Sequence, residues 1–561
     1  MKTTYTYDHF YLYGEIEEIL RGYAEKYPHL TRLESLGKTA AGRDIWAISV
    51  TDTRTGDFAD KPAYCVDANI HAGEVTGSMC AMYLLDVLYS GSGEDPAIDK
   101  LLETYTFYVI PRITPDGSEV YLTTPATLRS IDKMYPFEDL MPGVQPCDLD
   151  GDGVIRRMRV QSPYGVWKQS PDDPRLLVKR GPDDTEGVFY NVFSEGMIED
   201  YEAGWVTQAP NKWGNDFNRN FPFAWEPEVR QTGAGTYPLI HTETKVMADF
   251  IAAHRNICCI LNMHTMGGVY LYPPGYKSGK EAFKEDMALY KALGRMGTEE
   301  SGYPAANVRD EYVEQGAGPI RGLFDDFNHF AMGLVNFTIE CWDLYPRAGF
   351  PHKYPLQPKT DAEQYEIMKA VYVWADANLG PEAIKPWTPF EHPQLGPVEI
   401  GGYDYKTLVQ NCPPAFLQQE VEKHGRFMLR EAKAMPRLEI RDVQVTPVGD
   451  AFKVGARVCN PSFLPTYVTK EALNLRIVGP LQAELEGEGL ELLEGKPTVD
   501  LGQLEGYSGI RAASAMGGQT SIMGAPCEKK VSWIVRAPAG TKIRVCFRHP
   551  RAGRASAEVV L

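Results

Sequence analysis

The stretch Ala63-Tyr-Cys-Val-Asp-Ala-Asn-Ile-His-Ala-Gly-Glu74 decides the expected fold. Its mostly apolar first part is typical of a buried strand that ends at Ile70, and the apolar segment 75–89 that follows is typical of a helix. His71 and Glu74 therefore stand three residues apart, directly after a strand. Open α/β sheets bind ligands beyond the carboxyl ends of their strands, where an imidazole and a carboxylate can converge on one metal ion. Alone, this spacing is a weak signal, because it is expected about once by chance in a Glu-rich chain of this length.

Three further stretches carry polar groups that suit metal or substrate chemistry. One apolar run ends at His264 and another ends at Glu340. A His at a strand end is usually only hydrogen-bonded, and a Glu there is commonly structural, but beside a metal ion a Glu can act as a general base. The third stretch contains Asn218 and Arg219, which can grip a carboxylate but can equally form a loop ion pair. Four such positions in one chain favour a metal hydrolase more strongly than any one of them does.

Strands and helices alternate along the first part of the chain, which predicts an α/β fold. Strand-like runs lie at 45–50, 63–70 and 105–111, and residues 11–27 have the periodicity of an amphipathic helix. This alternation is typical of a mixed, mostly parallel sheet with helices on both faces. We therefore expect residues 1–435 to form one catalytic domain.

Two segments interrupt this pattern. Residues 118–210 are rich in Asp, Pro and Gly and exceed an ordinary connection, so we expect an irregular insertion near the mouth of the site. Residues 388–435 should pack on the core, as loops up to residue 402 and then as a helix from about residue 414.

The pattern changes again from residue 436 to residue 561. Short alternating runs, for example 438–443, 452–458, 473–478 and 542–547, are separated by turn signals. These features predict an antiparallel β-sandwich, an accessory domain for packing or substrate placement.

The stretch 148–153 spaces Asp148, Asp150 and Asp152 like the first half of a calcium loop. The twelfth position is Arg159, where an EF-hand needs a bidentate Glu. Calcium binding therefore stays open, and an Asp-Gly turn is the favoured reading.

Composition limits the partners. The net charge of −18 at pH 7 argues against nucleic acid and anionic membranes. The N-terminus carries no apolar targeting segment, and no run approaches the ~20 apolar residues that span a bilayer, so we expect a cytoplasmic protein without membrane contact. The ten cysteines are scattered, which suits free thiols. The oligomeric state stays open.

Together, the four positions resemble the zinc metallocarboxypeptidases of the carboxypeptidase A and B type. The H-x-x-E, Asn-Arg, strand-end His and strand-end Glu of that family occur here in the same order. The intervals from Asn218 to His264 and from His264 to Glu340 are also similar. The interval from Glu74 to Asn218 is longer, which places the extra residues in the 118–210 insertion.

The resemblance implies a role for each matching residue. His71, Glu74 and His264 would hold one zinc ion and leave its fourth position for water, which zinc makes a competent nucleophile. Glu340 matches the general base. Asp216 matches the carboxylate that orients the first ligand His.

Other matches concern the substrate. Asn218 and Arg219 match the pair that binds the terminal carboxylate, so the substrate would be a peptide with a free C-terminal carboxylate. Arg129, about a dozen residues beyond a Pro-Asp-Gly motif, matches the Arg that polarises the carbonyl. The insertion offers three alternatives for this Arg: Arg156, Arg157 and Arg159.

The chain also departs from the family. Digestive members carry an Arg between the first two ligands, where this chain has Ala72 and Gly73, so one substrate contact is missing. Tyr312 is the nearest counterpart of the mobile active-site Tyr. Asp325 falls at the specificity position, where an acid would attract Lys or Arg side chains. A shift of one residue would remove this match, and Asp325 could equally face solvent.

Three functions are compatible with these residues. The favoured one is a zinc metallocarboxypeptidase, with a preference for basic C-terminal residues if Asp325 keeps the expected place. The alternatives are an N-acyl amino acid amidohydrolase of the aspartoacylase and desuccinylase type, or a cell-wall peptide hydrolase, on the same scaffold. A non-enzymatic binding protein is disfavoured because every chemical group is present.

Overall fold

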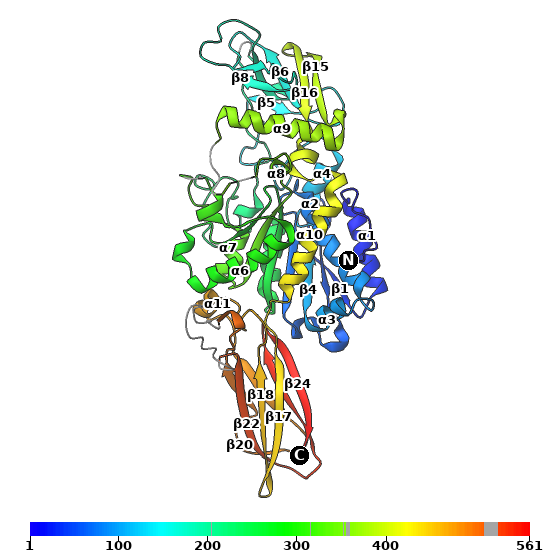
Figure 1. Ribbon diagram of the computed structural model, residues 1–561, viewed down its shortest axis with the longest axis vertical. Helices are drawn as coiled ribbons and strands as arrows, with labels where there is room; N and C mark the ends of the chain where they lie inside the picture. The colour runs from blue at the N-terminus through cyan, green and yellow to red at the C-terminus, as the bar shows by residue number, and fades with distance from the viewer. Residues whose placement is uncertain (203–204, 315, 352, 355–358, 510–525) are drawn as a thin grey trace.

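The computed structural model describes residues 1–202, 205–314, 316–351, 353–354, 359–509 and 526–561. An α/β body forms the middle of the molecule, with a small sheet at one end and a β-rich unit at the other (Figure 1). In the described chain the body holds an eight-stranded sheet, in the order β1 (Thr31–Lys38), β2 (Asp44–Val50), β4 (Thr106–Ile110), β3 (Ala63–Ala68), β11 (Ile257–Thr265), β14 (Val335–Cys341), β12 (Val269–Tyr272) and β13 (Ala305–Asn307).

The four central strands, β4, β3, β11 and β14, run parallel, so their carboxyl ends meet at one edge of the sheet. The pairs β1–β2, β2–β4 and β12–β14 are antiparallel. β3 and β11 are buried over their whole length, which explains their nearly continuous apolar runs. The expected mixed sheet with a parallel centre is confirmed.

Helices cover both faces of this sheet, as expected. Buried side chains of α1, α2, α6, α9 and α10 share one hydrophobic cluster, and those of α5 and α7 share the cluster on the other face. α2 is buried on nearly every side, which explains why its sequence is apolar without an amphipathic stripe. The helices of the body are α1 (Tyr13–Lys26), α2 (Val75–Gly91), α3 (Pro96–Thr104), α4 (Pro115–Thr123), α5 (Thr242–Ala253), α6 (Lys284–Ser301), α7 (Phe324–Phe330), α8 (Leu344–Arg347), α9 (Asp361–Leu379) and α10 (Pro414–Ala432).

A buried row of polar side chains crosses the central strands. Asn262 of β11 donates from Nδ2 to Oδ2 of Asp67 on β3 at 2.6 Å, and its Oδ1 accepts from Asn336 of β14 at 2.7 Å. Asn336 accepts in turn from Asn328 of α7 at 2.8 Å. Buried polar groups are costly unless they are paired, so a shift of one residue in the strand register would break this row. The row therefore fixes which residues stand side by side at the sheet edge.

The 118–210 segment is only partly irregular, because its described part contributes six short strands, β5 to β10. Residues 388–402 lie mostly in two strands, so the expectation of loops there was wrong. In the described chain the two segments form one six-stranded antiparallel sheet beyond α9 (Figure 1). Local sequence patterns do not show a pairing such as that between β16 and β6, which are more than two hundred residues apart. The order is β15 (Ile384–His392), β16 (Gly396–Tyr403), β6 (Arg157–Gln161), β9 (Tyr190–Ser194), β7 (Trp167–Gln169) and β8 (Leu177–Lys179); β5 (Gly143–Pro146) pairs separately with β10 (Gly196–Glu199).

Prolines made the 388–402 segment resemble a loop. Pro389 of this segment lies in β15, which is an edge strand of the small sheet. A proline has no N–H to donate, and an edge strand tolerates this loss on its open side.

Arg159 of β6 contacts residues on three other strands of the small sheet. It is buried, bonds Glu399 through Nε at 2.8 Å and Nη2 at 3.1 Å, and lies between the rings of Tyr190 and Trp387. Arg156 bonds Asp152 and the Gly402 carbonyl. These arginines are therefore engaged within the small sheet.

Two four-stranded antiparallel sheets of the described chain make up the C-terminal unit and share one hydrophobic core. The first contains β17 (Glu439–Val448), β18 (Ala451–Cys459), β22 (Glu528–Arg536) and β20 (Glu491–Glu494). The second contains β21 (Thr498–Gly502), β19 (Leu481–Glu486), β23 (Lys542–His549) and β24 (Gly553–Val560). The expected β-rich C-terminal unit is present.

One expected strand in this unit is a helix. Residues 473–478 alternate like a strand, yet α11 spans Lys470–Leu475. Thr469 caps this helix by accepting from the Ala472 N–H, and Asp286 of the body accepts the N–H groups of Lys470 and Glu471. Tertiary contacts at its first turn thus override the local pattern.

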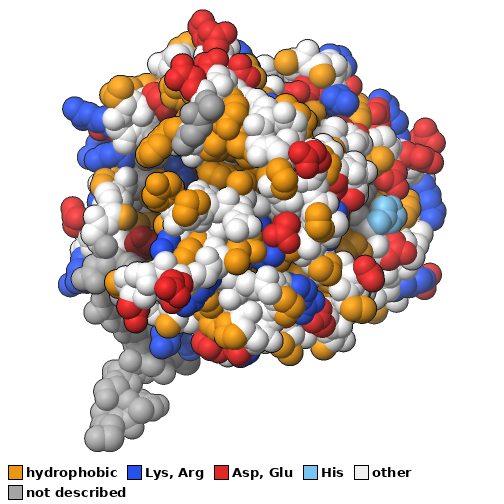
Figure 2. Space-filling view, turned by 90° about the horizontal axis from the view of Figure 1, so that it is seen from above, with side chains coloured by type: hydrophobic (Ala, Val, Ile, Leu, Met, Phe, Trp, Pro, Cys, Tyr) orange, Lys and Arg blue, Asp and Glu red, His pale blue; other side chains and the backbone are white. Residues whose placement is uncertain are grey.

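The surface shows no single sign of charge at the end that carries the small sheet. Acidic and basic side chains are interspersed there, and hydrophobic side chains gather around a hollow (Figure 2). Among the described helices, none is long and apolar enough to cross a bilayer. All ten cysteines are free.

We expect Arg159→Met to destabilise the small sheet by about 2–3 kcal/mol, because Glu399 loses its partner and two rings lose the guanidinium between them. Amide hydrogen exchange of β6 and β9 would measure this locally. Lys245→Ala, which removes an exposed ion pair with Asp249, is the control and should cost no more than about 0.5 kcal/mol. Unchanged protection of β6 in the Arg159 variant would contradict this role.

Candidate active site

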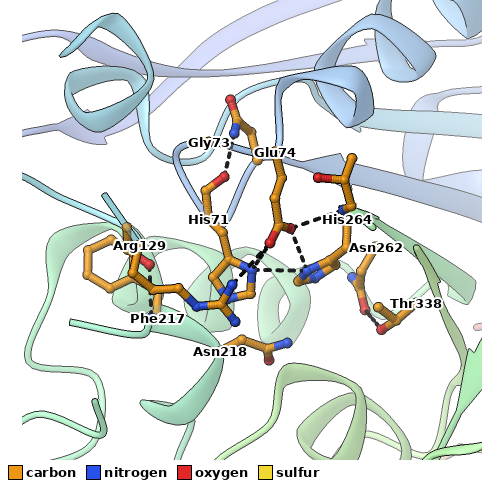
Figure 3. Close-up of polar contacts among 12 residues, drawn as sticks. His71, Gly73, Glu74, Arg129, Phe217, Asn218, Asn262, His264 and Thr338 are labelled. Carbon is orange, nitrogen blue, oxygen red and sulfur yellow. Dashed lines mark hydrogen bonds and ion pairs between the residues drawn. The ribbon is translucent and has the colours of Figure 1, made fainter. Parts of the chain in front are cut away.

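Three side chains converge at the carboxyl edge of the central sheet (Figure 3). His71 and Glu74 follow β3, and His264 lies on β11, where the strand register sets it beside Glu340 of β14. The Nδ1 atoms of His71 and His264 are 3.2 Å apart. Oε1 of Glu74 lies 2.8 Å from the first of these atoms, and Oε2 lies 2.9 Å from the second. Each of the three residues is at most 3% exposed.

This geometry fits a divalent metal ion. Zinc–nitrogen bonds of ~2.0–2.1 Å hold two tetrahedral ligands about 3.3 Å apart, close to the 3.2 Å between the two imidazole nitrogens. Two imidazole nitrogens that face each other need a proton or a cation between them. Burial raises the pKa of Glu74, but His71 and His264 together hold that pKa well below its usual range, so an ionised carboxylate completes the donor set. The expected ligand trio can therefore hold one ion.

Asn69 shapes the turn that carries the first two ligands. Its φ of 65° is left-handed, a conformation that Asn adopts more readily than other non-glycine residues. Its buried Nδ2 donates to the carbonyls of His71 and Ala72, at 2.6 and 3.0 Å. The chain is thereby turned sharply from β3 into α2, with His71 and Glu74 on the inside of the turn.

Asp216 and Arg129 hold the ligands from the side. Oδ1 of Asp216 accepts from Nε2 of His71 at 3.0 Å, which aims the other ring nitrogen at the metal position. Nε of Arg129 lies 3.0 Å from Oδ2 of Asp216, and its Nη1 lies 3.1 Å from Oε1 of Glu74. Burial raises the pKa of Asp216, but Arg129 and its other cationic neighbours hold it well below its usual range. Both residues lie where the sequence predicted them, at the edge of the ligand trio.

Glu340 borders the same position. Burial raises the pKa of its carboxyl to about 7, while His264 opposes this shift and Glu74 adds to it. Its Oε2 is buried and finds no hydrogen-bond partner among the described residues. A carboxylate with a near-neutral pKa and a free oxygen is suited to accept a proton.

Asn218, Arg219 and Asp325 line the wall beyond the ligands. Asn218 accepts from the Phe324 N–H at 2.8 Å, and Nη1 of Arg219 donates to the Asn218 carbonyl at 2.7 Å. Asp325, at the start of α7, is 3% exposed, so it does not face solvent. Burial raises its pKa to about 6, and the charges of His264 and Arg219 act against this rise. The predicted specificity residue is therefore buried within reach of the charges of His264 and Arg219.

Comparison with known proteins agrees with this geometry. A family model described as zinc carboxypeptidase matches residues 16–140 and 190–362, more than half of the chain. The chain belongs to the zinc carboxypeptidase family. The unmatched residues between these ranges contain β6, β7 and β8 of the small sheet and β5 of the two-stranded sheet. Residues 437–560 match a domain of unknown function.

Similar proteins include other carboxypeptidases. Carboxypeptidase D of Anas platyrhynchos is 31% identical over 107 residues, which is 19% of this chain and 8% of that protein. Human carboxypeptidase O is 24% identical over 292 residues, 51% of this chain and 58% of that protein. Among solved structures, thrombin activatable fibrinolysis inhibitor has a TM-score of 0.44 at 14% identity, with 76% of this chain and 77% of the other covered. The chain thus matches only part of the length of these curated relatives.

Tyr312 lines a cavity with Met266 and Trp342, close to the end of β14 that carries Glu340. It ends the π-helix η5 (Val308–Tyr312) and stacks on Tyr354, with ring centroids 6.0 Å apart. Burial and the neighbouring charge of Glu340 raise its pKa. This position is compatible with the expected counterpart of the mobile Tyr.

The sequence missed residues 404–411, which lie outside the family match. Asn411 of this segment donates from Nδ2 to the Gly73 carbonyl at 2.8 Å, between the two predicted ligands His71 and Glu74. Gln410 accepts from the Tyr121 hydroxyl at 2.9 Å beside Gly73. Gly73 was the one sequence signal for this contact. A glycine between His71 and Glu74 has no side chain, so another part of the chain can pack against it.

The 148–153 loop is not supported as a calcium site. Lys385 of β15 places Nζ 2.6 Å from carboxylate oxygens of both Asp150 and Asp152. Asp148 accepts the N–H groups of Gly151 and Gly153, as in an Asp-Gly turn. Lys385 thus neutralises two of the three carboxylates expected to bind calcium, those of Asp150 and Asp152. The local sequence pattern does not indicate this partner, because it lies on a distant strand.

We expect calcium to leave the thermal unfolding midpoint unchanged, within about 1 °C, because Lys385 already compensates the acidic loop. The comparison is between excess calcium and a calcium chelator that leaves zinc bound. An upward shift of several degrees in calcium would contradict this expectation. Lys385→Ala is the positive control, because Asp150 and Asp152 lose their lysine partner in this variant and become free to bind calcium.

Proposed function

We propose that the protein is a zinc-dependent metallocarboxypeptidase that removes the C-terminal residue of peptides. The observation that carries this proposal is the meeting of His71, Glu74 and His264 within coordination distance, with the unpaired oxygen of Glu340 beside them. Arg219 lies on the neighbouring wall, where it can bind a terminal carboxylate. Family membership supports the reaction class.

The chain supplies the remaining parts of the reaction. Zinc, when bound, makes a water nucleophilic near neutral pH. Glu340 takes the proton of the attacking water on its free oxygen and passes it to the nitrogen of the leaving amine. The Arg129 guanidinium stabilises the negative charge that develops on the scissile carbonyl oxygen, and its bonds to Asp216 and Glu74 keep it at the site. Asp216 holds the proton on Nε2 of His71, so that the ring keeps the orientation a ligand needs.

Substrate choice follows from the wall beyond the ligands. Asn218 and Arg219 bind the terminal carboxylate, which selects free C-termini over internal bonds. Asp325, buried next to Arg219, attracts a basic C-terminal side chain. We therefore propose a preference for peptides that end in Lys or Arg.

We expect Glu340→Gln to lower kcat by about 10³-fold, because the variant cannot accept the proton of water. Its zinc content should remain that of the wild type, since Glu340 is not in the ligand trio. Turnover of a peptide with a free C-terminus, together with metal analysis, measures both effects.

The same assay separates the alternatives. A C-terminally amidated version of the peptide should resist cleavage, and an N-acyl amino acid should be a poor substrate. Near-wild-type turnover by the Gln variant would refute the role of Glu340. Faster hydrolysis of the N-acyl amino acid than of the peptide would instead favour an amidohydrolase.

We expect Asp325→Asn to lower kcat/KM for a peptide ending in Lys by about 30- to 100-fold, since the substrate loses a charge-assisted bond. The matched peptide ending in Leu should change little. The assay is run at pH 8, above the raised pKa of about 6, so that Asp325 is ionised in the wild type. An equal loss for both peptides would show that Asp325 does not set specificity.

A further inference from the structure

A segment beyond the family match contacts the loop that carries two of the metal ligands. Residues 404–411 follow β16 and contain the π-helix η7 (Lys406–Gln410), and the chain then leads into α10. The family match ends at residue 362. Asn411, at the end of this segment, is fully buried, and it contacts the turn between His71 and α2.

Helix α2 begins directly after a metal ligand, and this creates a capping problem. Its N-cap residue is Glu74, whose side chain makes no cap hydrogen bond. The Glu74 carboxylate is directed at His71 and His264, so it cannot also accept the first N–H groups of the helix. Another group must accept them, because buried N–H groups without partners are costly.

Asn411 takes this place from more than three hundred residues away. Its Oδ1 accepts both the Thr76 N–H and the Thr76 hydroxyl, each at 3.0 Å. Its Nδ2 donates to the Gly73 carbonyl at 2.8 Å. The Asn411 amide thus bonds the backbone on both sides of Glu74, at Gly73 and at Thr76.

Neighbouring side chains hold this amide in place. Nδ2 of Asn411 also lies 3.1 Å from the Tyr121 hydroxyl, which donates to Gln410. A Cβ at Gly73 would stand 2.7 Å from both Gln410 and Tyr121. A larger residue at position 73 would therefore displace this support.

We propose that Asn411 is a positioning residue that fixes the backbone from Gly73 to Thr76 and thereby keeps the ligand atoms of His71 and Glu74 at coordination distance. The inference rests on the proposed zinc site. It adds a residue from outside the family match to the apparatus that holds the metal. Asn411 does not touch the reacting atoms, and it acts only through the ligand loop.

Asn411→Ala should weaken zinc binding by about tenfold or more, which is the usual effect of losing a group that orients metal ligands. The measurement is a competition between the full-length protein and a chromophoric zinc chelator. Asn411→Asp keeps the oxygen that caps Thr76 and loses the donor to Gly73, so its affinity should lie between those of wild type and Asn411→Ala.

Asn256→Ala is the matched control. Asn256 is also buried, and its Nδ2 bridges the carbonyls of Phe58 and Lys61 at 2.9 and 2.8 Å. It precedes β11 at the end opposite to His264, so its loss should lower the unfolding temperature without changing zinc affinity by more than about twofold.

Wild-type zinc affinity in Asn411→Ala, or an equal loss of affinity in Asn256→Ala, would overturn the proposal. The readout is metal occupancy and needs no substrate. A wild-type protein that binds zinc but does not trim peptides would contradict the proposed function, and the difference between the two Asn variants would still decide the role of Asn411.

Discussion

The parallel pairing of β3, β11 and β14 is the constraint on which the site depends. It brings residues 71, 264 and 340, far apart along the chain, to one edge of a sheet. A register error of one residue would turn His264 to the opposite face and remove it from the site. The buried row from Asp67 through Asn262 and Asn336 to Asn328 makes such an error costly, because these polar groups find partners only in the observed register.

Around this edge, charges of opposite sign are arranged in alternation. Glu74 lies between two imidazoles and the Arg129 guanidinium, and Asp216 lies between the same guanidinium and His71. Each carboxylate is thereby held ionised in a buried place, which is the state that a metal or an imidazole N–H requires. Glu340 is set apart, because the neighbouring cations do not outweigh burial at this carboxyl, so its pKa is raised and not lowered. One of its oxygens also has no hydrogen-bond partner among the described residues. The surroundings thus keep Glu74 and Asp216 ionised, while Glu340 is left able to accept a proton.

The sequence was sufficient for features that have a local cause. Apolar runs that end at Ile70 and His264 predicted two buried strands and the candidate ligands at their ends, and the alternation of elements predicted the mixed sheet. The failures have a common origin in contacts over long sequence distances. β16 completes the small sheet with β6, Lys385 neutralises the loop around Asp150, and Asp286 stabilises a helix where residues 473–478 alternate like a strand. A pattern read within a short window contains no information about partners that lie hundreds of residues away.

The closure of the small sheet has a consequence for synthesis on the ribosome. Domains generally fold as units while the chain emerges from its N-terminus. β6 ends at residue 161, but the strand that covers its other edge ends only at residue 403. During translation of the intervening residues, this edge of β6 has no partner from its own sheet. The nascent protein must therefore carry an open strand edge while the α/β body is still being made. Asn411, which bonds Gly73 and Thr76 on either side of Glu74, leaves the ribosome later still.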